Sequence, residues 1–334
     1  MSDLPLVSAI IATYNRAHIV EEAIESILHQ TYANVELIVI DDGSVDNTRE
    51  VLDRYAGRIK SVYQENAGPA AAWNRGIQES RGEIITFLGS DDIWLPTFLQ
   101  NQVAVLQEAG EAVPCCLCNG WLRYGTGKGT TSFEYSLLNS ELPRGVWTNV
   151  KEVLSTRFVA FGQMVAIRRS VLERIGLFDK DLRYLEDYDM ALRLAVEGPW
   201  GFIREPLVVW RQGTTDSLSQ EGAQKRIQLI GIWIRVRERV LQSLPAGDKF
   251  FAMRKLLGRT LSHTYGERRA VELSQRGNVA AALLGRVLLF AGRVRGFIFR
   301  RSRAFPQMMV ASLPAVPSTH SVNETLVAHT AAVS

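Results

Sequence analysis

The segment FLGSDDIWLP, residues 87–96, places two adjacent carboxylates at the end of an apolar run. Burying Asp91 and Asp92 would be costly unless they turn into water or a cation compensates them. Hard oxygen ligands of this kind suit Mg²⁺ or Mn²⁺, which can act as a Lewis acid on a leaving group. An exposed turn that ends at Pro96 is the structural alternative. The pair therefore predicts either a divalent metal site at Asp91 and Asp92 or a turn in solvent.

A second acidic pair lies in IDDGSVDNT, residues 40–48, where Asp41 and Asp42 directly follow an apolar strand pattern. The Gly43-Ser44 that comes next is typical of a turn before a capped helix. In a second interpretation, Asp42 accepts a hydrogen bond from a nucleobase N–H, and Tyr14 at a neighbouring strand end stacks on the base. The residues alone leave both interpretations open.

A third acidic pair, Glu186 and Asp187, stands at the head of a helix pattern in LEDYDMALRLAVEG. A carboxylate at this point either stabilises the helix dipole or acts as a general base that removes a proton from an attacking hydroxyl. Asp187 follows Asp91 by 96 residues in the sequence. The fold can therefore place it on the far side of a substrate from the metal.

Strand and helix patterns alternate through residues 6–88. Apolar, β-branched runs predict strands at 6–12, 35–40, 59–64 and 83–88, and helical spacing predicts helices at 18–30, 46–57 and 68–80. This alternation indicates βαβ units and a mainly parallel, Rossmann-like sheet with helices on both faces. Ligands bind beyond the carboxyl ends of the strands in such sheets, so the segments after each strand should converge: 13–15, 41–44, 65–66 and 89–92.

Two familiar nucleotide motifs are absent. Lys128 is followed by Gly129, and Leu122 stands where the first glycine of a phosphate loop would be, so YGTGKGTT predicts a hairpin turn. No Gly-x-Gly-x-x-Gly follows the first strand, which argues against a dehydrogenase. With 46% apolar residues, the chain of 334 residues can bury a large core, and disorder throughout is excluded.

The charge distribution separates a C-terminal arm from the rest of the chain. Residues 250–310 hold 12 Lys and Arg against only Glu267 and Glu272, so the totals of 38 basic and 35 acidic residues leave 26 and 33 elsewhere. We expect an α/β domain, a basic helical extension and a disordered tail. Their predicted bounds are 1–220, with halves 1–113 and 114–220, then 221–305 and 306–334.

The segment 280–303 is apolar but carries Arg286, Arg293 and Arg300 on one face at heptad spacing, with Arg295 on the opposite side. Contact with an anionic membrane surface, packing against the body, and a membrane span remain open for it.

The cysteines indicate a reducing compartment. Cys115, Cys116 and Cys118 lie in one run without a second group at metal-ligand spacing, which favours a reduced, buried strand. The first apolar run is too short for a signal peptide and has no basic segment before it. We therefore expect a cytoplasmic protein, peripheral on the cytoplasmic face of the membrane if the basic arm binds it.

Four stretches together resemble family 2 glycosyltransferases of the GT-A fold, in the family's order and spacing over about residues 5–215. They are VSAIIATYNR, QTYANVELIVIDDGSVDNT, ENAGPAAAWNRGIQESRGEIITFLGSDDIWLP and RRSVLERIGLFDKDLRYLEDYDMALRLAVEG. The resemblance implies a metal-dependent, inverting transfer from a UDP-, dTDP- or GDP-sugar to a hydroxyl-bearing glycan or lipid-linked acceptor. It also implies a role in cell-surface polysaccharide or glycolipid synthesis, with Mg²⁺ or Mn²⁺ as cofactor and no nucleic acid partner.

By the same resemblance, Tyr14 and Asp42 would contact the base, Asp91 would ligate the metal, and Asp187 would be the catalytic base. Asp92 is expected as a further metal ligand. The other expected substrate-binding residues are Thr13, Asn15, Gly68, Asn74, Ser90, Glu186 and Arg211.

The sequence departs from the family pattern at three places. Gly89 stands where the metal motif usually has an acid, so its contact is lost or passes to Ser90 or Asp92. Trp73 replaces a frequent Arg, and Gly213 stands where many relatives carry the His of Tyr-Arg-x-His. Gly89 and Gly213 support a rival interpretation, a GT-A-like binding or scaffold protein with impaired catalysis.

Overall fold

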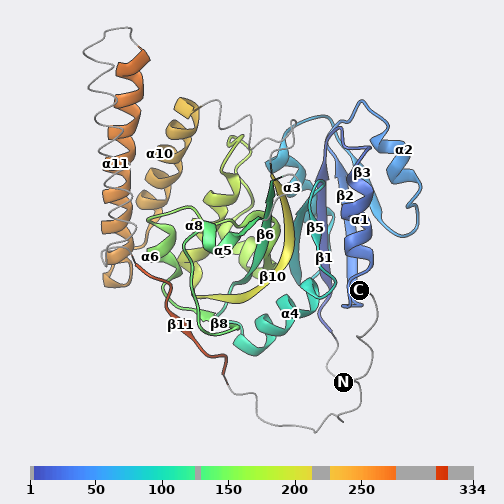
Figure 1. Ribbon diagram of the computed structural model, residues 1–334, viewed down its shortest axis with the longest axis horizontal. Helices are drawn as coiled ribbons and strands as arrows, with labels where there is room; N and C mark the ends of the chain where they lie inside the picture. Colours follow the sequence, from blue (N-terminus) through green and yellow to red (C-terminus); the bar gives the residue numbers. More distant parts are fainter. Residues whose placement is uncertain (1–3, 125–128, 213–225, 276–305, 315–334) are drawn as a thin grey trace.

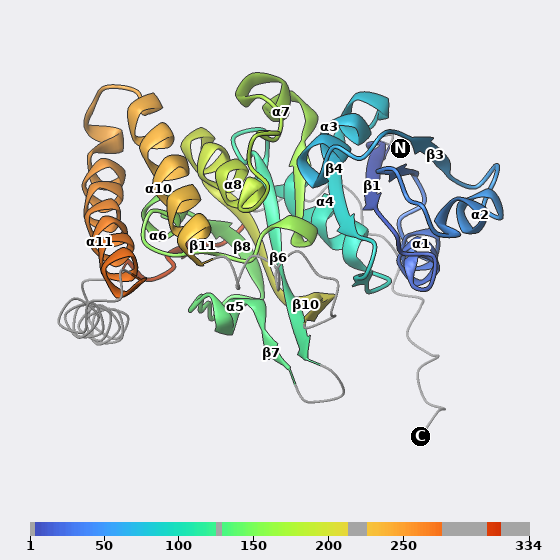
Figure 2. The ribbon, with the colours of Figure 1, turned by 90° about the horizontal axis from the view of Figure 1, so that it is seen from above.

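The computed structural model describes residues 4–124, 129–212, 226–275 and 306–314. A single mixed sheet forms the centre of the molecule, and helices cover both of its faces (Figures 1 and 2). The strands are β1 (Val7–Thr13), β2 (Val35–Asp41), β3 (Lys60–Tyr63), β4 (Ile84–Gly89), β5 (Ile93–Trp94), β6 (Cys115–Tyr124), β7 (Thr130–Thr131), β8 (Arg144–Trp147), β9 (Val165–Arg168), β10 (Trp200–Gln212) and β11 (Val310–Ala311).

The described helices include two 3-10 helices, η1 directly before β9 and η2 directly before α11. In chain order, the described helices are α1 (Val20–Leu28), α2 (Thr48–Asp53), α3 (Pro69–Glu79), α4 (Phe98–Ala109), α5 (Ser132–Tyr135), α6 (Val150–Leu154), η1 (Gly162–Met164), α7 (Arg169–Ile175), α8 (Glu186–Glu197), α10 (Arg226–Ser243), η2 (Asp248–Phe250) and α11 (Phe251–Gln275).

The first four strands form the parallel part of the sheet, in the order β4-β1-β2-β3. The apolar runs of β1, β2 and β4 are buried on both faces, as in β1, where Val7, Ile10 and Ile11 have no exposed surface, whereas the edge strand β3 is largely exposed. Such continuous apolar runs are typical of strands covered by helices on both sides. The parallel order places the loops after β1, β2 and β4 at one edge.

The second half of the sheet is mixed. β9 runs antiparallel between β4 and β6, and β10 lies parallel to β6 and antiparallel to β8. Because the register of β10 shifts around Pro206, this strand bends and also pairs with β5 beside the end of β4. The end of β10 is thereby brought to the same edge as the loops of the parallel strands.

The run CCLC forms the start of β6, and its three thiols are free and buried. Burial raises the pKa of Cys115 and Cys116 well above the usual value for a thiol. These cysteines therefore serve as small core residues.

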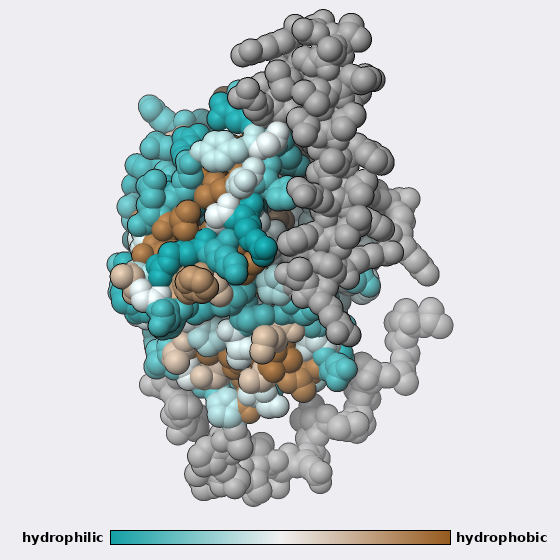
Figure 3. All heavy atoms as spheres, turned by 90° about the vertical axis from the view of Figure 1, so that its left-hand side faces the viewer, coloured by the Kyte–Doolittle hydropathy of each residue, from teal (hydrophilic) through white to brown (hydrophobic). Residues whose placement is uncertain are grey.

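The described part of the C-terminal extension is a pair of helices at one end of the molecule. α10 packs against α8, and α11 packs against α10 and α6 (Figures 1 and 2). The described surface on this side mixes hydrophilic and hydrophobic side chains (Figure 3). Among the described residues, no helix has the length and apolar character needed to cross a bilayer. The segment 280–303, on which the expected membrane contact rests, lies outside them.

The predicted disordered tail is wrong for its first part. Residues 306–314 run along the edge of the sheet, where β11 pairs antiparallel with β8. The Asn149 side chain donates to the carbonyl of Gln307 at 2.6 Å and accepts from the Met309 N–H at 2.8 Å. This Pro-containing segment is ordered here because its backbone groups find partners on an open strand edge and because Met308, Val310 and Leu313 pack against the core.

Helix α3 packs directly on β1 because Gly76 has no side chain. A Cβ atom at this position would lie 2.3 Å from Cγ2 of Ile10, which is buried in the sheet. We expect Gly76→Ala to lower the free energy of unfolding by about 1–3 kcal/mol, because the overpacked contact must push helix and strand apart. Denaturant unfolding of the purified variant measures this change.

Gly258 in α11 offers a matched control, since a Cβ atom there would meet nothing within 4 Å. Gly258→Ala should be neutral or stabilise by about 0.5–1 kcal/mol through helix propensity. Equal effects of the two substitutions would contradict the close approach of α3 and β1.

Candidate active site

A cavity of about 650 Å³ opens at the carboxyl edge of the parallel strands. The loops after β1, β2 and β4, the start of α3, the end of β10 and the segment before α8 form its wall. The lining residues are Ala12, Thr13, Tyr14, Asn15, Arg16, Asp42, Asn66, Gly68, Pro69, Ala72, Trp73, Gly89, Ser90, Asp91, Arg183, Trp210 and Arg211. Seven expected substrate-binding residues and Asp91 thus lie on one cavity: Thr13, Tyr14, Asn15, Asp42, Gly68, Ser90 and Arg211.

Backbone and side-chain bonds fix the loop after β1 to the loop after β2. Asn15 Oδ1 accepts from the N–H of Val45 at 2.8 Å, and the backbone N–H of Asn15 donates to Ser44 Oγ at 2.9 Å. Asn15 has a φ of 53°, a left-handed conformation that asparagine tolerates better than most residues. The neighbouring Tyr14 keeps 46% of its surface exposed. Its ring is therefore available to a ligand in the cavity.

The Asp42 carboxylate is buried and accepts three hydrogen bonds from the loop after β3. Its Oδ1 accepts from Gln64 Nε2 at 2.7 Å and from the N–H of Ala67 at 2.9 Å, and Oδ2 accepts from the N–H of Gly68 at 2.9 Å. Gly68 has a φ of +88°, which favours glycine, and it precedes the first turn of α3. Asp42 thus shapes the cavity wall, and its contact with a base stays a prediction.

The tandem Asp91-Asp92 is divided between two environments. Asp91 lines the cavity, whereas Asp92 is 4% exposed, and its Oδ1 accepts from the N–H of Arg211 at 2.8 Å. Burial and the nearby Asp91 carboxylate raise the pKa of Asp92 well above its usual value. Asp92 is thus not among the residues that line the cavity and joins β10 to the loop after β4, and its role as a further metal ligand stays a prediction.

Gly89 leaves room for these two carboxylates. A Cβ atom at this position would lie 2.8 Å from Oδ2 of Asp92 and 3.1 Å from Oδ1 of Asp91. An acid here would have to displace a carboxylate that is already packed. The missing acid of the metal motif is thus linked to the inward position of Asp92.

The donor set fits a hard divalent ion through Asp91. The described residues contain no group of three His, Cys, Asp or Glu that could hold a metal by protein ligands alone. Mg²⁺ and Mn²⁺ in nucleotide sites often take one or two carboxylates, with substrate phosphates and water completing the shell. Asp91 lines the cavity and can supply such a carboxylate.

Arg211 closes the cavity from the end of β10. Its guanidinium pairs with Glu22 of α1, and its backbone N–H holds Asp92. Trp210 beside it and Trp73 on α3 add two aromatic side chains to the wall. Gly213, at the position of the expected His, lies outside the described residues.

Glu186 and Asp187 begin α8 directly after Leu185, which has a φ of +65°. Such a left-handed turn in a non-glycine residue is uncommon and reverses the chain direction just before the helix. Asp187 Oδ1 accepts from the N–H of Tyr188 at 2.7 Å, and the N–H of Gly162 also donates to its carboxylate. The backbone carbonyl of Gln163, the residue after Gly162, accepts from Trp94 Nε1 at 2.9 Å. Through η1, the base candidate is therefore tied to the segment that follows Asp91.

Both carboxyl groups of this pair have raised pKa values. Burial, followed by the charge of Asp187, raises the pKa of Glu186 to about 8. Burial raises the pKa of Asp187 to about 6, against the opposing hydrogen bonds from Tyr188 and Gly162. The two groups titrate as a pair, so near neutral pH they share one proton and one of the two carboxylates is ionised. Neither residue is among those lining the cavity described above.

Asn74 does not lie on the cavity, in contrast to its expected role. Its side chain is buried, donates to the carbonyl of Phe178 at 2.8 Å and accepts from the Phe178 N–H at 2.9 Å. It therefore positions the loop before α8. Arg16 and Arg183 line the cavity but were not expected as site residues. Their positions in the sequence, directly after Asn15 and shortly before Glu186, could have indicated that they belong to the site.

The family model described as glycosyl transferase family 2 matches residues 8–176. The chain belongs to glycosyl transferase family 2. An uncharacterized glycosyltransferase from Rickettsia typhi is 31% identical over 235 residues, which cover 65% of this chain and 68% of the relative. The glycosyltransferase EpsJ of Bacillus subtilis is 31% identical over 189 residues, 55% of this chain and 54% of EpsJ.

Solved structures show the same GT-A fold. S. aureus TarS, residues 1–349, superposes with a TM-score of 0.61 at 15% identity, covering 82% of this chain and 76% of TarS. The mannosyltransferase PcManGT from Pyrobaculum calidifontis, solved with GDP-Man and Mn²⁺, gives a TM-score of 0.55 at 21% identity, covering 90% and 83%. The expected fold class is thereby confirmed for this family 2 chain.

The role of Asp42 in the cavity wall can be tested by removing its carboxylate. Asp42→Ala leaves the Gln64 side chain and two backbone N–H groups without their acceptor, so we expect a loss of about 2–4 kcal/mol in unfolding free energy. Denaturant unfolding measures the loss. Glu50→Ala, at an exposed position of α2, is the control and should stay within about 0.5 kcal/mol of the unchanged protein. A similarly small effect at Asp42 would show that it does not hold the loop.

Proposed function

We propose that this family 2 glycosyltransferase moves a sugar, with inversion, from a nucleotide-diphosphate sugar to a hydroxyl acceptor. The observation that carries the proposal is the shared cavity of Tyr14, Asp42 and Asp91, with the Asp187 carboxylate anchored through η1 to the segment after β4. Solved neighbours support the donor class, since TarS was solved with UDP and with UDP-GlcNAc, and PcManGT with GDP-Man.

The donor half binds the nucleotide with aromatic and polar groups. The exposed ring of Tyr14 stacks on the base. The Asp42 carboxylate holds the loop before α3 in place, and its remaining lone pairs can accept a hydrogen bond from the base. Asp91 would hold a Mg²⁺ or Mn²⁺ ion, which would compensate the negative charge on the departing diphosphate. Arg211 and Ser90 complete the wall on that side.

Asp187 acts on the acceptor. Its carboxylate takes the proton from the acceptor hydroxyl while the oxygen attacks the anomeric carbon, and the bond from that carbon to the diphosphate oxygen breaks on the opposite face. The proton resides on Asp187, the electron pair of the broken bond leaves with the diphosphate, and the configuration at the carbon inverts. The N–H groups of Gly162 and Tyr188 hold the carboxylate in one orientation.

The proposed donors are UDP-, dTDP- or GDP-sugars, and the acceptors are glycans or lipid-linked glycans of the cell surface. Assays of binding and of donor turnover distinguish this proposal from the rival interpretation, a nucleotide-sugar-binding protein that has lost catalysis. Among the described residues, Gly89 is the one that supports this rival. The space that a side chain at position 89 would need is occupied by the carboxylate of Asp92. A binding protein would take up the nucleoside diphosphate without turning over any donor.

We expect Asp187→Asn to lower kcat about 10²- to 10⁴-fold with little change in the donor KM, because the amide cannot accept the proton. Initial rates are measured with a panel of nucleotide sugars in Mn²⁺ and, separately, with chelator. Mass spectrometry identifies the product. Chelator should abolish transfer by the unchanged protein.

Asp181→Asn is the matched control, since Asp181 is exposed in the loop before α8 and carries the same substitution. It should keep the rate of the unchanged protein. Full transfer by Asp187→Asn on an authentic donor and acceptor would rule out the base assignment. Nucleoside diphosphate binding by calorimetry, without turnover of any donor by the unchanged protein, would favour the rival binding protein.

The raised pKa of Asp187 predicts a pH dependence. Protonation disables the base, so kcat should fall tenfold per unit as pH drops below about 6. Glu186→Gln should leave this acid limb in place, because Glu186, with a pKa of about 8, is already protonated there. The pH profile of kcat measures both. An acid limb near the ordinary value of an aspartate, about 4, would contradict the buried environment of the base.

A further inference from the structure

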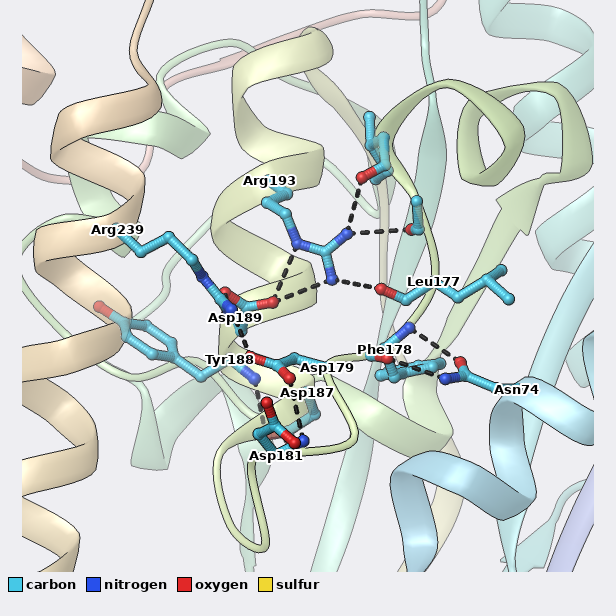
Figure 4. Close-up of polar contacts among 12 residues, drawn as sticks. Asn74, Leu177, Phe178, Asp179, Asp181, Asp187, Tyr188, Asp189, Arg193 and Arg239 are labelled. Carbon is cyan, nitrogen blue, oxygen red and sulfur yellow. Dashed lines mark hydrogen bonds and ion pairs between the residues drawn. The ribbon is translucent and has the colours of Figure 1, made fainter.

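A cluster of two arginines and two carboxylates surrounds the first turns of α8 (Figure 4). At its centre is Asp189, which has no exposed surface. Its Oδ2 accepts from Arg193 Nε at 2.9 Å, and its Oδ1 accepts from Arg239 of α10. The buried carboxylate is thus held by one arginine of its own helix and one from the C-terminal extension.

Arg239 makes a second ion pair, with Asp179 in the loop between α7 and α8. One guanidinium therefore bridges the loop before Asp187 and the helix after it. A planar fork with several donors suits such a bridge, whereas the point charge of a lysine ammonium does not reproduce its geometry. The Arg239 side chain keeps 44% of its surface exposed, so it lies over the cluster rather than within the core.

Other contacts fix the start of the same loop. Arg193 donates to the carbonyls of Ile175, Gly176 and Leu177 at 2.9–3.0 Å, and Asn74 holds both backbone groups of Phe178. Asp179 then meets Arg239 (Figure 4). The loop that leads to Glu186 and Asp187 is therefore anchored at its first four residues, 176–179.

α10 also contacts the residue between the base and Asp189. Arg237 Nη1 donates to Thr264 Oγ1 at 2.8 Å, its guanidinium lies 4.6 Å from the Trp233 ring, and its Nε faces the Tyr188 hydroxyl at 3.4 Å. The Tyr188 hydroxyl in turn donates to the carbonyl of Leu154 at 2.8 Å. Two residues that directly follow Asp187 thus depend on α10.

We propose that Arg239 is a positioning residue for Asp187, and that through it the C-terminal extension forms part of the active site. The inference rests on the proposed role of Asp187 as the base. Arg193 alone already pairs with the buried Asp189, so compensation of that charge does not require Arg239. What Arg239 adds is the connection between Asp179 and Asp189, which sets the path of the turn through Leu185.

The test compares Arg239→Met, Asp179→Asn and the double variant with the unchanged full chain. Each single variant should lower kcat about 10- to 100-fold, because small displacements of a catalytic group are costly, while the donor KM changes less than about twofold. The double variant should be no slower than either single one, since both break the same bridge. Arg239→Lys should recover only part of the rate.

Hydrogen exchange gives a readout that does not depend on turnover. Peptides covering 176–190 should exchange faster in Arg239→Met and in Asp179→Asn, with α11 unchanged. Tyr265→Phe is the matched control, because it removes a hydrogen bond from α11 to Glu238 of α10 without touching α8. It should match the unchanged protein in kcat and in exchange.

A kcat and an exchange rate in Arg239→Met equal to those of the unchanged protein would overturn the inference. So would faster exchange spread over the whole of α10 and α11, since it would mean that the extension merely detaches. Asp187→Asn separates the two proposals. If it is inactive while Arg239→Met is unaffected, only the present inference fails. If it is fully active, the base assignment and this inference fail together.

Discussion

The arrangement of this molecule depends on how it compensates carboxylates that are removed from water. An ionised group without partners in a low-dielectric interior is too costly to keep. Asp42 is satisfied by donors of a neighbouring loop, and Asp189 is satisfied by two arginines. Asp92 meets a single backbone donor, and the pKa of its carboxyl is raised well above the usual value. Each of these three acids ties one segment of the structure to another, and the proposed chemistry falls to Asp91 and Asp187.

The two sides of the site are held by different means. On the donor side, loops that follow adjacent parallel strands bond to one another, as Asn15 does with Ser44 and Val45. On the acceptor side, the loop before α8 has almost no regular structure, and its partners come from far along the chain. Phe178 is held by a residue 104 positions earlier and Asp179 by one 60 positions later. The position of the base is therefore a property of the whole fold.

Sequence patterns predicted the strands, the helices and the edge on which the site lies, because burial and period are local properties. They could not predict which of Asp91 and Asp92 faces the cavity. The inward position of Asp92 depends on the N–H of Arg211, which is far along the chain. The position of Asn74 away from the cavity was missed for the same reason, as its partner Phe178 is distant. The order of residues 306–314 also escaped prediction, because it depends on pairing with β8 and on packing of Met308, Val310 and Leu313 against a core built from distant segments.

The bridging cluster at α8 suggests how chains of this fold can vary one substrate independently of the other. The family model ends at residue 176, before the loop, the base and the extension. Among the described residues, those that line the cavity with Tyr14, Asp42 and Asp91 include no arginine of α10, so we expect changes in the extension to leave the donor wall intact. In our proposal they act instead on the path from Asp179 to Asp189, which positions Asp187 toward the acceptor hydroxyl. A terminal helix pair can thus tune acceptor geometry while the nucleotide chemistry stays constant.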